Sequence, residues 1–467
     1  MQKRSNPPAP RRVPSAGHDA HQPKKSLGQN FLLDAELARW IADRIEPDSA
    51  DAVLEIGPGH GALTEHLAGR TRELILVEKD TALAAALRAR FAGRHDVLVI
   101  HDDATRIDLR SFYCRGGVSV IGNLPYSTGT EIMRHLLTPP TPVTRAIFML
   151  QKEVCDRLCA KAGDDAFGAL SLLVQQDWEV EMLRVVPPSV FKPKPKVDSA
   201  VVRLVPRPPG TLPVFDRVWF RRLVRMGFSQ RRKQLKNLLP DAPGGWTALA
   251  ARLCVPATVR AEELSLAQWV AVARWYEQRN DTDRGQKATE LFDVVDERNI
   301  VTCQRPRGEV HALGLRHRAV HVFVFNKRGE VYLQKRSHLK DAHPLVWDSS
   351  AAGHLDVGES YSDCAVREVR EELGVEIAAT QRTAGIPATE QTGWEFVELH
   401  TAEHNGPMNC APDEIETGGW FRPADVTGWV RARPQDFASG FIECWRAWLA
   451  CRPGDHQTAE EALPDQS

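Results

Sequence analysis

The stretch Ala52-Val53-Leu54-Glu55-Ile56-Gly57-Pro58-Gly59-His60-Gly61 decides how the first half of the chain folds. The apolar run before Gly57 predicts a buried strand, and the residues from Leu63 to Leu67 begin a helix after the glycine loop. A strand, a glycine loop and a helix place bare backbone next to a ligand at the edge of a sheet. The spacing is G-x-G-x-G and lacks the final offset glycine of the dinucleotide fingerprint, so the loop alone is a weak signal.

Two further predicted strands end in acidic residues. The run 74–77 is followed by Glu78, whose carboxylate can bind both hydroxyls of a ribose. The run 97–100 leads to Asp103, whose carboxylate can accept a hydrogen bond from an adenine amine. Each carboxylate could instead be a solvated strand end. Found after successive strands, the two favour S-adenosylmethionine (SAM) over a nicotinamide cofactor.

A fourth predicted strand, 118–122, runs into Asn123-Leu124-Pro125-Tyr126. The proline ends the strand and fixes the turn at its carboxyl end. The Asn123 oxygen and the Leu124 carbonyl could then accept hydrogen bonds from the exocyclic amine of a base, while Tyr126 stacks on its ring. An ordinary strand-ending turn is the alternative interpretation of these four residues.

A rigid basic loop and a basic helical region follow. The loop 186–199 holds four prolines and three lysines, and it presents Phe191 either as a stacking surface for a flipped base or as a plug of the core. Residues 217–239 are expected to form helices that contact a phosphate backbone, although a charge run is usually a solvated face. The basic residues expected to contact RNA there are Arg221, Arg222, Arg231, Arg232 and Lys233.

Composition and charge set limits on the whole chain. Its 467 residues suggest about three domains or subdomains. Residues 1–280 carry 40 Lys and Arg against 30 Asp and Glu, whereas residues 281–467 carry 20 against 31, so a polyanionic partner is expected for the first part only. No apolar stretch approaches the ~18 residues that cross a bilayer, so no membrane partner is expected. The nine cysteines include no C-x-x-C pair, which fits a reducing cytoplasm.

Residues 24–280 resemble the KsgA/RsmA family of small-subunit rRNA adenine-N6,N6-dimethyltransferases. The matching motifs stand in the family's order across nearly the whole region: 28–32, 54–59, 123–126, 148–154, 193–199 and 230–233. The resemblance implies a Rossmann-like α/β methyltransferase domain with a small helical subdomain. It further implies that SAM is bound by Gln29, Asn30, Leu32, Glu55, Gly57, Gly59, Glu78, Asp103 and Asn123.

The resemblance also implies a substrate and a reaction. Asn123 and Leu124 would hold the target N6 while Tyr126 and Phe191 sandwich the adenine. The expected substrate is a pair of adjacent adenosines in a hairpin loop near the 3′ end of 16S rRNA, presented by a precursor of the 30S subunit. Two alternatives stay open: a related methyltransferase acting on 23S rRNA, and a ribosome-assembly factor that binds without catalysis.

The second half of the chain contains a spaced set of acidic residues. Glu368, Glu371 and Glu372 fall on one face of a predicted helix, where they would repel one another unless a divalent cation lay among them. Gly374 is suited to the left-handed helix cap. A solvated acidic helix is the alternative.

From Gly353 to Val375 the spacing matches the Nudix box, G-x5-E-x7-R-E-U-x-E-E-x-G-U, at every fixed position. The resemblance implies an α/β/α Nudix domain in which Glu359, Glu368, Glu371 and Glu372 bind Mg²⁺ or Mn²⁺ and Arg367 orients them. It implies hydrolysis of a small molecule that contains a diphosphate. A regulatory Nudix-like domain that binds without turnover is the alternative, and Glu416 is a further possible ligand or base.

The flanks resemble the isopentenyl-diphosphate isomerase-like branch of Nudix proteins. The isomerase requires a cysteine directly before the Gly-His pair, where this chain has Ala351 and Ala352, so hydrolysis is favoured. His311, His317 and His354 could echo the isomerase's metal site or be ordinary core and surface histidines.

The expected organisation combines these assignments. A disordered basic tail occupies 1–23, a methyltransferase domain 24–208, a helical rRNA-binding subdomain 209–280, a linker 281–287, a Nudix domain 288–455 and a second tail 456–467.

Overall fold

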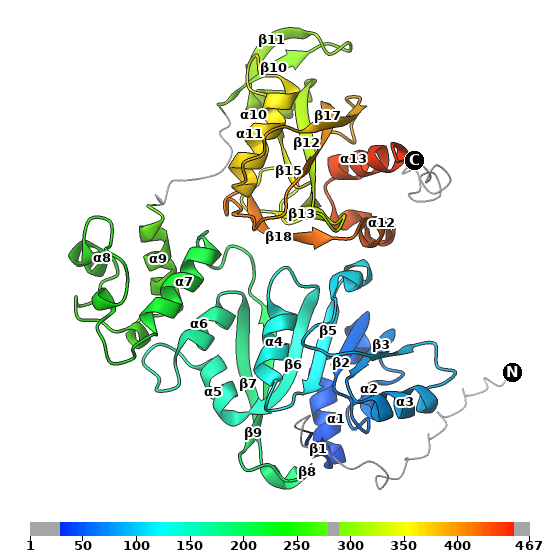
Figure 1. Ribbon diagram of the computed structural model, residues 1–467, viewed down its shortest axis with the longest axis vertical. Coiled ribbons are helices and arrows are strands. Elements are labelled where there is room, and N and C mark those ends of the chain that lie inside the picture. The colour runs from blue at the N-terminus through cyan, green and yellow to red at the C-terminus, as the bar shows by residue number, and fades with distance from the viewer. Residues whose placement is uncertain (1–28, 279–288, 453–467) are drawn as a thin grey trace, which may run out of the picture.

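The computed structural model describes residues 29–278 and 289–452. The expected tails 1–23 and 456–467 and the linker 281–287 lie outside these residues. Residues 29–278, called here the N-terminal unit, form the lower part of Figure 1, and residues 289–452, the C-terminal unit, form the upper part. Among the described residues no helix is long and apolar enough to span a membrane.

The N-terminal unit is built on a seven-stranded sheet of order β4-β3-β2-β5-β6-β9-β7. Strands β4 to β6 in this order are parallel, whereas β9 runs antiparallel between β6 and β7. This is the expected Rossmann-like arrangement, and the predicted strands lie where the apolar runs placed them. The strands are β2 (Ala52–Ile56), β3 (Glu73–Glu78), β4 (Val97–His101), β5 (Val118–Asn123), β6 (Val143–Gln151), β7 (Trp178–Val186) and β9 (Ser199–Pro206).

Hydrophobic cores cover both faces of this sheet. Leu54 packs in one core with Met133 of α4 (Gly129–Leu137), while its neighbour Val53 packs in the other with Ile41 of α1 (Ala35–Arg44). Consecutive strand residues point to opposite faces, so both kinds of position must be apolar in a sheet covered on both sides. The other helices are α2 (Thr64–Leu67), α3 (Thr81–Arg90), α5 (Lys152–Cys159) and α6 (Ala169–Gln175).

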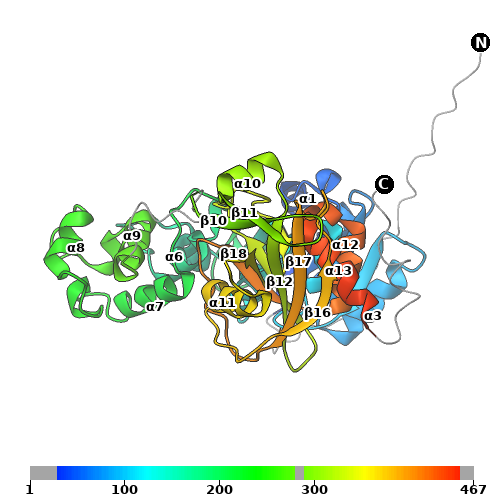
Figure 2. The ribbon, with the colours of Figure 1, turned by 90° about the horizontal axis from the view of Figure 1, so that it is seen from above.

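A helical subdomain extends from one end of the sheet, at the left of Figures 1 and 2. It contains α7 (Arg217–Gly227), α8 (Trp246–Arg252) and α9 (Leu266–Tyr276). Its core centres on Trp269, which is fully buried. A Cβ at Gly227 would lie 2.5 Å from the Trp269 ring, so α7 needs a glycine where it crosses α9.

The C-terminal unit has its own seven-stranded sheet. Its central strand β12 (His317–Phe325) runs parallel to β17 (Glu395–Glu403) and antiparallel to β13 (Val331–Arg336) and β15 (Ala351–His354). The pairing of Phe325 with Val331 confirms the predicted hairpin. The remaining strands are β14 (Trp347–Asp348), β16 (Gln381–Ile386) and β18 (Ile415–Phe421), and β10 (Leu291–Val295) and β11 (Val301–Pro306) form a separate hairpin.

Helices cover both faces of this second sheet, as an α/β/α architecture requires. α11 (Tyr361–Leu373) packs on one face, whereas α12 (Pro423–Ala432) and α13 (Ser439–Ala450) pack on the other. α10 (Arg307–Leu313) follows the β10–β11 hairpin. Gly374 ends α11 at φ 62°, which confirms the left-handed cap.

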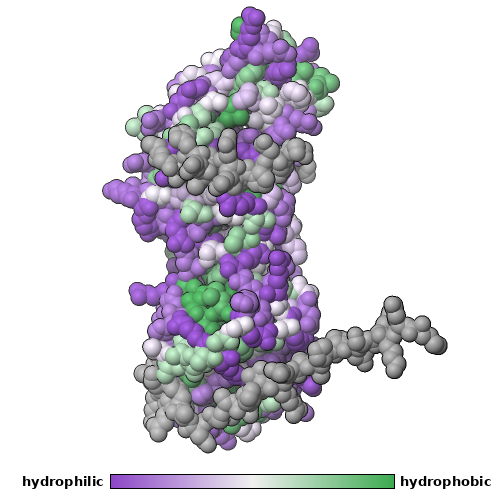
Figure 3. All heavy atoms as spheres, turned by 90° about the vertical axis from the view of Figure 1, so that its right-hand side faces the viewer, coloured by the Kyte–Doolittle hydropathy of each residue, from purple (hydrophilic) through white to green (hydrophobic). Residues whose placement is uncertain are grey.

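The surface seen from the side is mostly hydrophilic, with a hydrophobic patch on the lower, N-terminal unit (Figure 3). In that unit β4 is an edge strand of the sheet, and its Leu98 side chain is 43% exposed.

Candidate active sites

A cavity of about 560 Å³ opens at the carboxyl ends of β2, β3 and β5. This is the edge at which open α/β sheets bind ligands. The cavity brings together every residue expected to bind SAM and three of the four expected to hold the base. They are Gln29, Asn30, Leu32, Glu55, Gly57, Gly59, Glu78, Asp103, Asn123, Leu124 and Tyr126.

The glycine loop leaves room for a ligand beside its backbone. Gly57 and Gly59 have φ values of 64° and 57°, in the left-handed region that favours glycine. A Cβ built on Gly57 would meet nothing within 4 Å, so bare backbone faces open space there. The Gly59 amide donates to Glu78 Oε2 at 3.0 Å, and the Asp80 amide donates to Glu78 Oε1 at 2.8 Å, which fixes this carboxyl at the end of β3.

Glu55 is buried behind the loop. Its Oε2 accepts a hydrogen bond from the Thr64 hydroxyl at 2.8 Å. Burial raises the pKa of the Glu55 carboxyl to about 8, and the nearby Glu78 charge acts in the same direction. Glu55 therefore tends to keep its proton at neutral pH and acts as a polar wall of the cavity.

Asp103 is ionised at the far side of the cavity. Partial burial acts to raise the pKa of its carboxyl, but Lys79, whose Nζ lies 2.7 Å from Oδ2, and hydrogen bonds from Thr105 hold it at about 2. Ionised Asp103 and backbone-anchored Glu78 match the donors of an adenosine, the amine and the ribose hydroxyls. The residues present therefore fit SAM.

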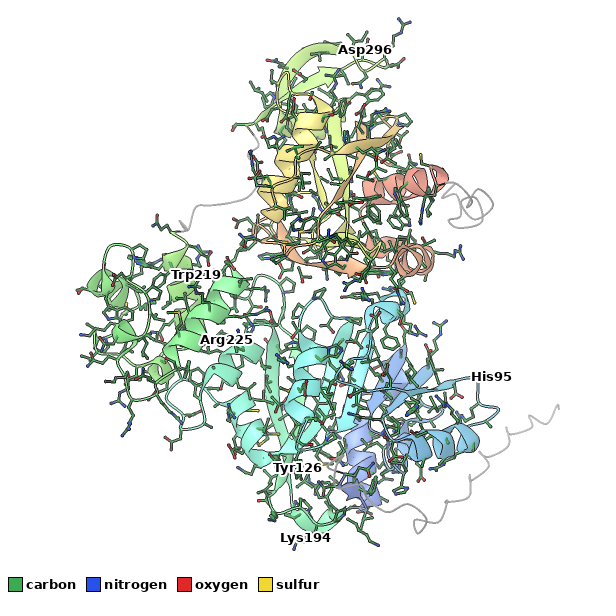
Figure 4. All side chains as sticks on the ribbon, in the orientation of Figure 1. His95, Tyr126, Lys194, Trp219, Arg225 and Asp296 are labelled. Atoms are coloured by element: carbon green, nitrogen blue, oxygen red, sulfur yellow. The ribbon has the colours of Figure 1, made fainter. Side chains whose placement is uncertain are left out.

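Asn123 is held in one orientation. Its Nδ2 donates to the Asn30 carbonyl at 2.8 Å, so Oδ1 is the acceptor on its other side. β5 comes close to β2 directly before this residue, because a Cβ at Gly122 would lie 2.8 Å from the Ile56 oxygen. The Tyr126 hydroxyl and Ser199 Oγ share a 2.5 Å hydrogen bond, and Figure 4 shows Tyr126 at the end of the unit away from the C-terminal unit.

The structure does not present Phe191 as an exposed stacking surface, so that expectation is wrong for this conformation. Phe191 is 4% exposed and packs in the core with Leu32. The cause is a short strand pair, in which β8 (Phe191–Lys192) runs antiparallel to β1 (Phe31–Leu32) and seats the ring under the loop. Its neighbour Lys192 lines the cavity instead.

The expected RNA-contacting residues separate into two groups. Arg222, Arg231, Arg232 and Lys233 are exposed. Arg222 lies over the Trp219 ring at 4.8 Å on α7, the helix that carries the Trp219 label in Figure 4. Arg221 is half-buried and lines a cleft between α7 and residues 408–417 of the C-terminal unit, so it is the least suited of the five to bind RNA. Within the expected helical region 217–239, α7 ends at Gly227 and a 3-10 helix, Leu235–Asn237, follows it.

A second cavity of about 650 Å³ lies in the C-terminal unit and contains Glu368, Glu371 and Glu372. Arg367 organises these carboxyls. It donates to Glu359 from Nε and Nη2 at 2.9 Å, and from Nη1 to Glu368 at 2.8 Å and to Glu371 at 3.2 Å. Glu359 does not line the cavity and stands behind Arg367.

Glu368 and Glu372 are the buried pair of this set. Burial, reinforced by the charge of Glu372 and opposed by that of Arg367, raises the pKa of Glu368 to about 8, and burial raises the pKa of Glu372. Gln334 Nε2 donates to Glu372 at 2.9 Å. A Cβ at Gly353 would lie 2.1 Å from Glu368 Oε1, so the first glycine of the spaced motif is what admits this carboxyl. Two buried carboxyls this close together repel each other when both are ionised. A divalent cation between them would remove this repulsion, so the pair fits a metal-binding site.

The three histidines noted in the sequence also come together. One ring nitrogen from each of His311, His317 and His354 lies within 4.8 Å of the others. Glu395 joins them, because its Oε1 lies 3.0 Å from His354 Nε2 and 3.5 Å from His317 Nε2. Glu395 was missed in the sequence, where it is one acidic residue in a strand with no motif around it.

Glu416 was a possible ligand or base, but it lies in the cleft beside Arg217 and His338, outside the carboxylate cavity. Glu414, two residues earlier, does line the carboxylate cavity, where it pairs with Lys340. Cys364 is buried, its Sγ donates to the His354 carbonyl, and burial raises the pKa of its thiol, so it stands in for no reactive cysteine.

Comparison with known proteins agrees with the geometry. Residues 20–278 match the family model "Ribosomal RNA adenine dimethylase", and residues 315–440 match the NUDIX domain model. The chain belongs to the ribosomal RNA adenine dimethylase family and carries a NUDIX domain in addition.

Curated relatives match the N-terminal unit over nearly their whole length. The Ribosomal RNA small subunit methyltransferase A of Actinobacillus pleuropneumoniae serotype 7 is 39% identical over 291 residues, 61% of this chain and 98% of the relative. That of Proteus mirabilis is 40% identical over 260 residues, 55% of this chain and 95% of the relative. Among solved structures, the 23S rRNA methyltransferase ErmE is 27% identical with a TM-score of 0.45, covering 53% of this chain and 100% of that one.

Proposed function

We propose that the N-terminal unit transfers methyl groups from SAM to the N6 atoms of two adjacent adenosines in the 3′-terminal hairpin loop of 16S rRNA. The observation that carries this proposal is the orientation of Asn123. With Nδ2 committed to the Asn30 carbonyl, Oδ1 can only accept, as the amine of an adenine requires. The small-subunit methyltransferases that match over nearly their full length support the choice of rRNA.

The mechanism needs positioning rather than covalent catalysis. The lone pair of an adenine N6 is delocalised into the ring, so the amine is a poor nucleophile. Acceptors at Asn123 Oδ1 and the Leu124 carbonyl would draw its two hydrogens toward a tetrahedral arrangement and free the lone pair. Tyr126 would hold the ring by stacking. SAM, bound by the glycine loop, Glu78 and Asp103, supplies an electrophilic methyl group on a sulfonium.

Asn123→Ala tests this assignment. Methyl transfer to precursor 30S particles should be lost, while rRNA binding, measured separately, stays near wild type. Asn123→Ala with full activity would overturn the assignment. Offering isolated 30S and 50S particles in parallel separates action on 16S from action on 23S rRNA, and a pure assembly factor would transfer no label from SAM to either.

For the C-terminal unit we infer metal-dependent hydrolysis of a small diphosphate. The carrying observation is the pair of buried carboxyls, Glu368 and Glu372, in a cavity that Lys340 and Arg336 also line. Glu368, Glu371 and Glu372 would hold Mg²⁺ or Mn²⁺, and the cluster of His311, His317, His354 and Glu395 is a second set able to hold a metal. When bound, such a cation neutralises a diphosphate and makes a bound water more acidic.

A panel of nucleoside, sugar and isoprenoid diphosphates tests the hydrolysis. Glu372→Gln keeps the volume of the side chain and should abolish phosphate release, whereas His311→Ala should spare it if the carboxylates form the working centre. Binding without turnover by the wild type would favour a regulatory domain. We further propose domain limits of 24–208, 209–280 and 288–455, and a cytoplasmic protein.

A further inference from the structure

The segment Arg110–Arg115, a short 3-10 helix between β4 and β5, carries two adjacent rings that enter different cores. Phe112 is 3% exposed and packs in the core of the N-terminal unit with Leu54. Tyr113 is 9% exposed and packs in the core of the C-terminal unit, among residues more than 200 positions away in the chain. One residue of the methyltransferase therefore belongs to the core of the Nudix domain.

The surroundings of Tyr113 are an aromatic socket, defined by Trp347, Phe421 and Trp429. The Tyr113 ring stacks on Trp429 with centroids 4.4 Å apart, and makes edge contacts with Trp347 and Phe421 at 5.5 Å. Aromatic pairs in these geometries stabilise a fold beyond what the burial of their apolar surface contributes. The Tyr113 hydroxyl is buried without a hydrogen-bond partner among the described residues, so the ring, not the hydroxyl, makes the contact.

Charged and closely packed groups surround the socket. Arg110 Nη1 lies 2.6 Å from Glu330 Oε1 and donates to the Trp420 carbonyl at 3.0 Å. Glu330 is 5% exposed, and Arg110 shares its carboxylate with Asn326 and Arg328 of the C-terminal unit, so the buried charge is paired across the interface as well as within its own unit. Gly116 fits against Arg433, because a Cβ there would lie 2.7 Å from Arg433 Nη1.

An aromatic anchor in a desolvated pocket, surrounded by charged groups, is the pattern of an interface with a few dominant residues. We propose that residues 110–116 are a docking element for the Nudix domain of the same chain, and that this domain completes its core only when Tyr113 is seated. The Nudix domain is then a dependent partner of the methyltransferase, held by a specific interface as well as by the chain.

The test is amide hydrogen exchange on the full-length chain with Tyr113→Ala. Protection of β18 and α12, which contribute Phe421 and Trp429 to the socket, should fall by about tenfold or more, because truncating a buried aromatic side chain costs a few kcal/mol. Protection of β2 and β5 and the affinity for SAM should stay as in the wild type. Unchanged protection of β18 and α12 would overturn the proposal.

Two variants keep the test decisive if Tyr113→Ala does not fold. Tyr113→Phe retains the ring and removes only the unpaired hydroxyl, so it should keep wild-type protection; loss of protection in β18 and α12 would contradict the role of the ring. Phe112→Ala is the matched control on the adjacent position. It should loosen β2 and β5 first, and if it loosened only the Nudix domain the division of the two rings would be wrong.

Discussion

The absence of a side chain at Gly353 decides where the Glu368 carboxyl can lie. Its position lets the buried Glu368 carboxyl reach the cavity, since a Cβ would lie 2.1 Å from Oε1 and 2.2 Å from Cδ. We therefore expect Gly353→Ala to displace Glu368 and to lower diphosphate hydrolysis by roughly a hundredfold or more, as loss of positioning by about 1 Å does elsewhere. Steady-state phosphate release measures this.

Gly428→Ala is the control for that substitution. Gly428 lies inside α12, and a Cβ there meets nothing within 4 Å. Alanine should therefore leave hydrolysis unchanged and stabilise the domain by up to about 1 kcal/mol. Equal losses in the two variants would mean that the effect is not specific to Glu368.

Tyr126 should act through its ring. Tyr126→Phe removes the hydrogen bond to Ser199 Oγ but keeps the stacking surface, so we expect a change of only a few-fold in methyl transfer. Tyr126→Ala removes the stack, worth about 1–3 kcal/mol per base, and should lower the rate about 5- to 150-fold. Single-turnover transfer to precursor 30S particles distinguishes the two; similar losses in both would assign the role to the hydroxyl.

Single residues were predictable where a motif fixed their environment. The glycine loop, Glu78, Asp103 and Asn123 all meet in one cavity, as their places at strand ends predicted. The buried state of Phe191 was not predictable, because the seating of its ring depends on a two-residue strand pair in which Leu32 pairs with Phe191 and Phe31 with Lys192. Glu414 and Glu416 could not be told apart, since both stand near the start of β18 and only the local pairing decides which faces the cavity.

At the scale of elements, the β2–loop–α2 unit carries a buried acid that links stability to pH. Burial raises the pKa of Glu55 to about 8 from its ordinary 4.5. The folded state thus binds the proton more tightly than the unfolded chain. Its contribution to stability is complete below about pH 4.5 and is lost as pH rises toward 8.

Glu55→Gln should therefore flatten this dependence. The amide mimics the protonated carboxyl and can still accept from the Thr64 hydroxyl. We expect the free energy of unfolding of the methyltransferase domain to change less between pH 5 and pH 8 in the variant than in the wild type. Relative to the wild type, the variant should therefore gain stability as the pH rises to 8. Denaturant titrations at pH 5, 6.5 and 8 measure it, and parallel curves for wild type and variant would contradict the raised pKa.

Elements with a clear apolar period were well predicted, including the strands of both sheets and the hairpin closed by Phe325 and Val331. The basic region 217–239, expected to form helices, was predicted less accurately, because residues 228–234 lie outside any helix. Composition could not show that α7 stops at Gly227, where packing against Trp269 leaves no room for a side chain. The close contact of Gly227 with Trp269 is a tertiary feature, and charge periodicity carries no information about it.

At the scale of the whole molecule, the exposed cations of the helical subdomain should determine how salt affects RNA binding. Replacing Arg222, Arg231, Arg232 and Lys233 together by Ala removes four exposed positive charges. If each neutralises a phosphate, the slope of log K against log salt should become shallower by about 0.7–0.9 per charge. Filter binding of precursor 30S particles, or of fragments of rRNA helices, over a series of salt concentrations measures this slope. Arg221→Ala, at a half-buried position, is the comparison variant. An unchanged slope would exclude this surface.

The arrangement of the two units was beyond the sequence. Charge separated a basic part from an acidic part, and the motifs identified a fusion. Nothing in the pattern around Tyr113 distinguishes it from an ordinary core aromatic, because the residues that surround it lie in another domain. Contacts between segments this far apart in the chain become visible only in the three-dimensional structure.

The docking segment joins β4 to β5 and so lies at the amino end of β5, whereas the methyltransferase cavity opens at the carboxyl ends of the same strands. The described residues that line each of the two cavities come from one unit alone. The proposed rRNA and diphosphate substrates would therefore have separate diffusion paths, and neither would need to leave before the other enters. Kinetically, the chain is expected to behave as two enzymes in one volume: saturating the diphosphate site should leave the KM for rRNA unchanged, and the two turnover rates should simply coexist.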